Sequence, residues 1–147
     1  MNNLLKTNND WTGLITRLVI TIVLFPHGAQ KLLGWWDGHG FAATMNYFTE
    51  TVKLPYLIGV TVILIEFFCP LFLLLGLGTR IFSFLILGVM TGVVITVQHH
   101  YFFMNWFGNQ TDEGAEFFLL IIGLCLVSML NGGGKWSLDR LIYKAKV

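Results

Sequence analysis

The strongest constraint on the fold is a set of four apolar segments, each long enough to cross a lipid bilayer. A helix needs roughly 20 mostly apolar residues to span the hydrocarbon core. Four segments meet that requirement. They are Thr12–Leu33, Leu54–Leu75, Ile81–Gln98 and Glu113–Leu130. The pattern predicts an all-α fold in which a single transmembrane domain, residues 1–147, forms an integral membrane bundle of four helices.

The composition is also that of a membrane protein. Apolar residues make up 55% of the 147 residues and charged residues only 12%, whereas about a quarter of the residues in soluble domains are charged. The formal net charge is +1, and the nine Lys and Arg are scattered along the chain. Because a nucleic-acid backbone requires a clustered basic surface, nucleic acid is excluded as a partner. The composition predicts membrane lipid as a partner instead.

The distribution of Lys and Arg predicts which side of the membrane each end faces. Cytoplasmic connections are enriched in these residues. Only Lys31 and Lys53 lie toward the first and third connections, and the other seven lie toward the termini or the second connection. Four spans place both termini on one side. We therefore expect cytoplasmic termini, with the first and third connections outside. The seven are Lys6, Arg17, Arg80, Lys135, Arg140, Lys144 and Lys146.

Two short helices are expected outside the spans. The first connection, Gly34–Lys53, has apolar residues at helical spacing, which predicts a short interfacial helix over the outer end. At the other end Gly132–Gly134 should stop the fourth helix, and Ser137 can cap an amphipathic C-terminal helix on the cytoplasmic surface. The apolar residues are Phe41, Met45, Phe48 and Val52 in the connection, and Leu138, Leu141, Ile142 and Ala145 in the tail.

Polar side chains inside the spans are the main clue to function. An ionised side chain costs roughly 2.5–3.5 kcal/mol at the bilayer centre, so each one needs a partner or a purpose. Glu66 lies about 18 Å along the helix from Leu54, near mid-membrane. The helical period places four residues of the first span on one inward face. These residues are Arg17, His27, Gly28 and Lys31.

The third and fourth spans carry polar or small residues of their own. Glu113 and Glu116 share a face of the fourth span. A stripe of small and polar residues in the third span would allow close helix packing. Four such faces directed at one axis predict a bundle with a polar interior. The stripe consists of Gly88, Thr91, Gly92, Thr96 and His99.

Depth in the membrane suggests how the charges pair. Arg17 enters from the inner side on a long side chain, so we expect it to reach Glu66. Lys31 and His27 lie in the outer half, at the level of Glu116, and one of them should pair with it. Two tiers of charge pairs are therefore predicted. Such pairs could serve only to fix the register of the helices, and the sequence leaves that alternative open beside a ligand or proton-handling site.

The sequence gives little support for a metal or haem centre. Only one of the four His, His27, lies well inside a span, whereas bis-histidine haem needs two facing ligands at one depth. The spacing matches no metal-ligand pattern. The two Cys lie singly in apolar segments, which excludes a vicinal thiol relay. The His could instead hydrogen-bond a quinone. These residues are His27, His39, His99 and His100, with Cys69 and Cys125.

Several of these residues, taken together, resemble the DoxX family of small four-helix bacterial membrane proteins. The resemblance covers nearly all of the chain, from about Arg17 to Leu141, and the order and spacing of its parts make it specific. The parts are Arg17 with His27-Gly28-x-x-Lys31, Glu66, Gly76-Leu-Gly-Thr-Arg80, Glu116 and Gly132-Gly-Gly-Lys-Trp-Ser137-Leu-Asp139.

The resemblance implies a component of quinone-linked redox chemistry in the bacterial inner membrane. That chemistry includes electron transfer from thiosulfate to quinone and responses to oxidants, beside soluble protein partners. We expect a quinone-like ligand in the outer half of the bundle, with Glu66, Arg17 and His27 handling protons. Whether the chain catalyses a reaction by itself is left open. The residues expected to hold the ligand are Lys31, Glu116, His99 and Gly28.

A non-catalytic function is the main alternative. Aromatic residues fill the third connection from Tyr101 to Phe107, more than a solvated loop needs. They would suit a membrane anchor or assembly factor whose outer loops dock a protein partner or a second copy of the chain. A small transporter could use the same charges. The spans lack its paired broken helices, although Pro26 and Pro70 could each kink one.

Overall fold

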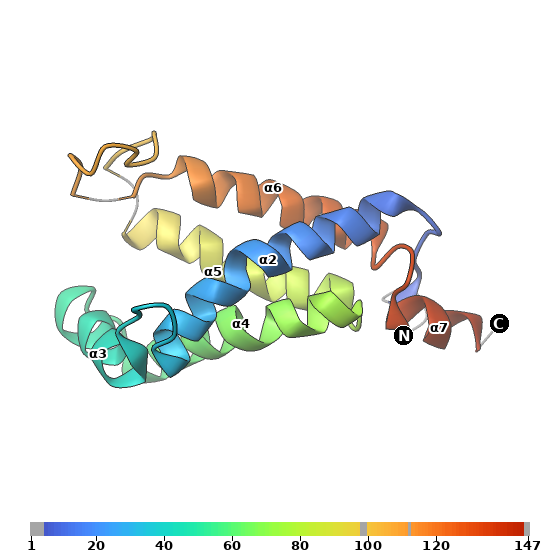
Figure 1. Cartoon of the computed structure of the whole chain (residues 1–147), viewed down its shortest axis with the longest axis horizontal. Helices are drawn as coiled ribbons and strands as arrows, with labels where there is room; N and C mark the ends of the chain where they lie inside the picture. Colours follow the sequence, from blue (N-terminus) through green and yellow to red (C-terminus); the bar gives the residue numbers. More distant parts are fainter. Residues whose placement is uncertain (1–4, 98–99, 112, 146–147) are drawn as a thin grey trace.

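The computed structural model describes residues 5–97, 100–111 and 113–145, and the regular elements in these ranges are all helices (Figure 1). Four long helices form the bundle, so the predicted all-α architecture is confirmed. The observed bounds differ from the expected ones only at the ends of the segments. The helices are α2 (Trp11–Leu33), α4 (Tyr56–Leu75), α5 (Thr79–Thr96) and α6 (Glu116–Asn131).

Three of the four helices are long and apolar enough to cross a membrane. They contain 23, 20 and 18 residues in α2, α4 and α5. The fourth, α6, is apolar but has 16 residues, about 24 Å at 1.5 Å per residue. Large apolar side chains such as Ile22, Ile95 and Leu120 remain 70%, 69% and 64% exposed. An outward apolar surface of this kind is suited to contact with lipid.

Helix α6 begins at Glu116 rather than at Glu113 because the third connection binds the backbone just before it. The N–H of Ala115 donates to the carbonyl of Tyr101 at 2.9 Å, and that of Glu116 to Phe102 at 2.9 Å. Gly114 has a φ of +83°, a left-handed conformation that a right-handed helix cannot include. Glu113 is therefore held in the loop.

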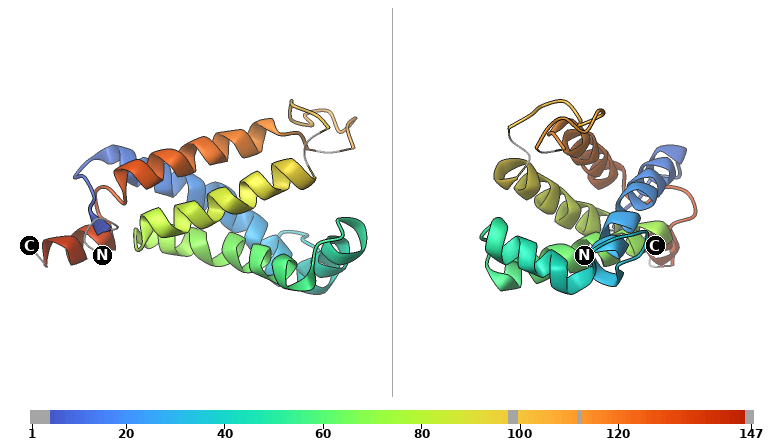
Figure 2. Two further views of the ribbon diagram at one scale, coloured as in Figure 1. Left: turned by 180° about the vertical axis from the view of Figure 1, so that it is seen from behind. Right: turned by 60° about the vertical axis from the view of Figure 1, so that its left-hand side comes forward.

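Figures 1 and 2 show the two terminal segments together at one end of the bundle. The third connection and the short helix α3 lie at the opposite end. The predicted arrangement, in which both termini share one end and the first and third connections share the other, is thus confirmed. Which end faces the cytoplasm stays a prediction.

Both short helices predicted outside the spans are present. The first connection forms α3 (Gly40–Asn46), which continues as a single π-helical turn, η1 (Tyr47–Thr51). Met45 on α3 is 4% exposed, so its side chain is buried as the predicted apolar face requires. At the other end α7 (Leu138–Lys144) is capped by Ser137, whose hydroxyl accepts from the N–H of Arg140 at 3.3 Å.

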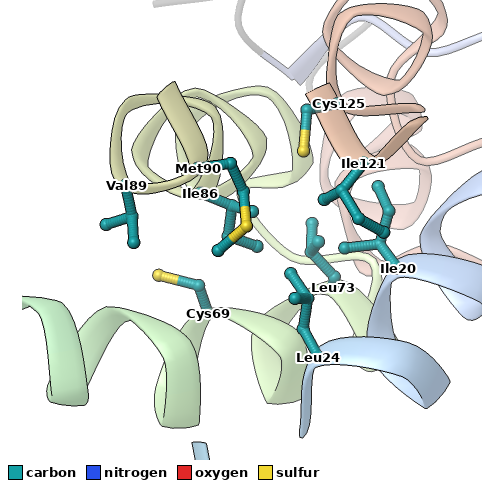
Figure 3. Close-up of a cluster of buried hydrophobic side chains, with 9 residues drawn as sticks. All are labelled: Ile20, Leu24, Cys69, Leu73, Ile86, Val89, Met90, Ile121 and Cys125. Carbon is teal, nitrogen blue, oxygen red and sulfur yellow. The ribbon is translucent and has the colours of Figure 1, made fainter. Parts of the chain in front are cut away.

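The apolar core lies at the middle of the bundle, where side chains from all four long helices meet (Figure 3). Ile20 of α2, Leu73 of α4 and Ile86 of α5 are at most 1% exposed. The free thiols of Cys69 and Cys125 are both buried in the same core. Buried Cys of this kind packs as a small apolar residue.

The expected role of the small residues on α5 is wrong for Gly88 and Gly92. A Cβ atom added to either glycine would meet no atom within 4 Å outside its own helix and neighbours. These glycines therefore leave open space instead of bringing another helix of this chain into contact. The close approach occurs between α2 and α4, where a Cβ on Gly28 would overlap the backbone of Glu66.

Candidate functional site

Helices α2 and α4 touch at Gly28 and Glu66, and the sequence explains why their backbones can come so close. Pro70 has no N–H, so the carbonyl of Glu66, four residues earlier, lacks its usual helical donor. Gly28 has no Cβ and is buried against that carbonyl. Small residues commonly allow such contacts between membrane helices. This contact fixes the depth at which the Glu66 side chain meets α2.

The carboxylate of Glu66 forms an ion pair with the Lys31 ammonium, on the next turn of α2 after Gly28. The Glu66 side chain is 3% exposed and that of Lys31 is 31% exposed. A buried carboxylate needs a partner of opposite charge, since an unpaired charge in an apolar interior is costly. Lys31 supplies that partner and still faces open space on one side.

Two cavities adjoin this pair. The inner cavity, of about 470 Å³, lies between α2 and α6 under the third connection. The loop cavity, of about 560 Å³, lies under the first connection. Lys31, Glu66 and Phe118 line both, so the ion pair stands at the wall between them. The other residues of the inner cavity are Leu24, His27, Met90, Met104, Glu113 and Phe117.

His27 faces the inner cavity from α2, but it does not point into the core as predicted. Its side chain is exposed, whereas Gly28 beside it is buried. The imidazole ring lies beside Phe117 of α6, with ring centroids 6.0 Å apart. Of the four residues expected on one inward face, two are buried, Lys31 is half-buried and His27 is exposed at the cavity.

Arg17 does not pair with Glu66, and this prediction is wrong. Its Nε donates to the carbonyl of Gly133 at 2.9 Å. Its Nη1 donates to the carbonyls of Leu73 and Leu74. Its Nη2 donates to those of Lys135 at 3.2 Å and Trp136 at 2.9 Å. All five donors of the guanidinium are thereby used on backbone carbonyls at the terminal end of the bundle.

The predicted pairing of Glu116 with Lys31 or His27 is also wrong. Its carboxylate accepts from the N–H of Met104 at 3.2 Å, which ties the third connection to the start of α6. The Lys31 ammonium is paired with the Glu66 carboxylate instead. Glu113, three residues before Glu116, lines the inner cavity together with Glu66. His99, expected to hold a ligand, lies outside the described residues.

The role of Asp139 was not predicted from the sequence. This carboxylate is 1% exposed and accepts from the N–H groups of Gly78 at 2.7 Å and Thr79 at 2.9 Å. Asp139, which belongs to α7, thus caps the start of α5. The negative charge also suits the positive end of the α5 dipole. An acidic residue in an otherwise basic tail was the available signal, but the neighbouring sequence does not indicate which group this carboxylate binds.

The inner cavity therefore combines two acids, an amine and an imidazole with apolar and aromatic walls. Small-molecule sites have this general character, in which a few polar groups orient a ligand held by apolar contacts. Within residues 5–97, 100–111 and 113–145, no group of three or more His, Cys, Asp or Glu is placed to hold a metal ion.

Comparison with known proteins identifies the family. A sequence model of the DoxX family matches residues 13–99, which is more than half of the chain. The chain belongs to the DoxX family. No curated protein matches it significantly, and no solved structure does either.

The part of the chain matched to DoxX runs from α2 to just beyond α5. It contains Lys31, Glu66 and His27, and therefore three of the polar groups of the inner cavity. Glu113 and Asp139 lie beyond it. The ion pair thus belongs to the segment shared with the DoxX family.

Proposed function

We propose that this DoxX-family membrane protein is a component of quinone-linked redox chemistry in the bacterial inner membrane, and that it binds the quinone ring in the inner cavity. The observation that carries the proposal is the Lys31–Glu66 ion pair at the cavity wall. A buried pair that served only to join helices would not need open space on both sides.

The residues present suit a quinone ring. Phe117, Phe118 and Met90 offer aromatic and thioether surfaces to a flat ring. Lys31 and His27 face the same cavity and can donate to carbonyl oxygens. This combination of flat apolar walls and two separate donors favours a ligand with two carbonyls over a purely apolar one.

A quinone, when bound, supplies the ability to accept electrons together with protons. Glu66 would hold and release a proton beside the ring. Because an opposite charge keeps a carboxylate ionised, movement of the Lys31 ammonium from Glu66 toward a ligand oxygen couples the carboxylate's charge to ligand binding. The electrons would come from a soluble protein partner, as the family resemblance implies.

Glu66→Gln tests the proposal, because it keeps the side-chain shape and removes the charge. We expect isothermal titration calorimetry of the purified protein with a decyl-benzoquinone to give binding for wild type. The Kd should rise by about tenfold or more in the variant, equivalent to the loss of one charge-assisted contact. Glu50→Gln is the matched control, because Glu50 is paired with Lys53 at 3.9 Å but is 69% exposed. Equal binding by wild type and Glu66→Gln would refute the proposal.

A specific observation supports a second candidate, an anchor or assembly factor that docks a protein through the third connection. Phe103, Trp106 and Phe107 are 66%, 73% and 90% exposed at the outer end. Exposed aromatic clusters mark interaction surfaces or membrane contacts. A photo-cross-linking residue at position 106 should give one protein adduct in cells, whose mass separates a second copy from another protein. Lipid adducts alone would contradict this candidate.

A further inference from the structure

A third open space lies between α4 and α5, outside the cavities that adjoin the ion pair. This lateral groove has a volume of about 490 Å³ and runs along the first half of α4 and most of α5. Leu57 and Phe84 on its walls are 76% and 58% exposed. The groove therefore opens on the side of the bundle that faces lipid.

Among the described residues that line the groove, no hydroxyl group is free. The lining is apolar apart from two threonines, Thr61 and Thr96. The hydroxyl of Thr61 donates to the carbonyl of Leu57 at 2.8 Å, and that of Thr96 to Gly92 at 2.8 Å. Both hydroxyls are thus bound within their own helices. The groove can offer a ligand apolar contact and little else.

Gly88 and Gly92 create the width of the groove. Both lie on its α5 wall, and a Cβ atom on either would meet nothing within 4 Å. Closely packed membrane helices normally use glycines to come into contact. Here the space beside the glycines stays open, which leaves room for an apolar chain.

The groove adjoins the loop cavity. Phe48 of η1, Val62 of α4 and Val93 of α5 line both spaces. The loop cavity in turn reaches Lys31 and Glu66, which also line the inner cavity. Apolar space open to lipid therefore lies beside the loop cavity, whose lining includes the buried ion pair.

We infer that the lateral groove binds the isoprenoid tail of the quinone, an inference that rests on the proposed function. A molecule with an apolar tail and a polar ring matches the sequence of spaces from groove to ion pair. A phospholipid would bring an anionic phosphate, and no Lys or Arg is among the described residues that line the groove. The gap between α4 and α5 then serves as the route from the bilayer.

Filling the groove tests this inference. Gly88→Leu and Gly92→Leu add side chains where the structure has space, so the helices should still form. We expect each to weaken binding of a long-chain prenyl quinone by about tenfold, since a few CH₂ groups lose their burial. Binding of a tail-less benzoquinone should stay unchanged. Gly123→Leu on α6 is the matched control, because a Cβ there also meets nothing within 4 Å.

The two probes separate failure of this inference from failure of the proposed function. If wild type binds neither quinone, the proposed function is refuted. If wild type binds both and the groove variants leave the long-chain affinity unchanged, or weaken both probes equally, the tail is not in the groove. Co-purified phospholipid that is lost from the variants, or loss of a dimer in them, would show another occupant and overturn the inference.

Discussion

The Lys31 ammonium and the Glu66 carboxylate form an ion pair that joins α2 to α4 at the wall between two cavities. The pair is asymmetric, because the acid is almost fully buried while the amine is about one-third exposed. The two residues therefore differ in the contacts that are open to them. Glu66 has Lys31 as its ion-pair partner in a buried position, whereas Lys31 also faces both cavities and could bind a ligand there.

Lys31→Met should destabilise the protein, because it leaves a buried carboxylate without its counter-charge. We expect a loss of about 3 kcal/mol, measured by thermal unfolding in detergent. Lys31→Met combined with Glu66→Met should recover most of that loss, since apolar residues can replace a buried pair. Lys53→Met, at an exposed pair, should change stability by less than about 1 kcal/mol. A double variant no more stable than the single one would contradict the pairing.

Asp139→Ala should weaken the start of α5, because two backbone N–H groups lose their acceptor. The expected cost is about 1–2 kcal/mol. Asp139→Asn keeps an acceptor and should lose less. Hydrogen exchange at Thr79 and its neighbours would report the effect directly. Asp37→Asn, at an exposed position, is the control and should leave this exchange unchanged. Equal protection of α5 in all three variants would show that Asp139 is not its cap.

Arg17→Lys should be disruptive even though it keeps the charge. An ammonium cannot reproduce the planar fork of a guanidinium, and Arg17 binds five carbonyls. Leaving two of them unpaired should cost about 2–4 kcal/mol. Limited proteolysis should then cut within Gly133–Trp136 more readily. Arg140→Lys, at a residue with one side-chain contact to Asn9, should not increase cutting. An unchanged rate of cleavage in Arg17→Lys would show that the guanidinium does not hold this segment in place.

The spans and the short helices could be predicted because they depend on local sequence. Apolar length sets each span, and the glycines with Ser137 set the start of α7. The pairing of Lys31 with Glu66 could not be predicted in this way. Both Arg17 and Lys31 lie on the first helix, and which of them meets Glu66 depends on the register of α2 against α4. That register is set by the contact between Gly28 and Glu66.

Depth in the membrane alone does not determine the partner of Arg17. Arg17 lies opposite Leu73 and Leu74, about 11 Å further along α4 than Glu66 at 1.5 Å per residue. From the sequence, the long Arg17 side chain was expected to cover that distance and reach the Glu66 carboxylate. Backbone carbonyls at the end of α4 were closer, and a helix end leaves such carbonyls unpaired. Sequence patterns identify charges, but they do not show the backbone groups that compete for them.

The orientation in the membrane can be tested with single cysteines. Asn109→Cys and Ala145→Cys change exposed residues at opposite ends of the bundle, in a background with Cys69→Ala and Cys125→Ala. We expect a membrane-impermeant maleimide to label the first in intact cells and the second only after permeabilisation, as cytoplasmic termini require. The reverse pattern would invert the topology, and the cysteine-free background should not be labelled.

Gly28→Ala tests whether the contact between α2 and α4 sets the geometry of the ion pair. Its Cβ would overlap the Glu66 backbone, so the helices must separate, at a cost of about 1–3 kcal/mol. Separation should also lengthen the Lys31–Glu66 pair. A double-mutant cycle with Lys31→Met should therefore show a smaller effect of removing the amine when Ala replaces Gly28. Gly123→Ala, which adds the same methyl group in open space, should leave stability and the coupling unchanged. If Gly28→Ala behaves like this control, close packing at Gly28 is not what holds the pair in register.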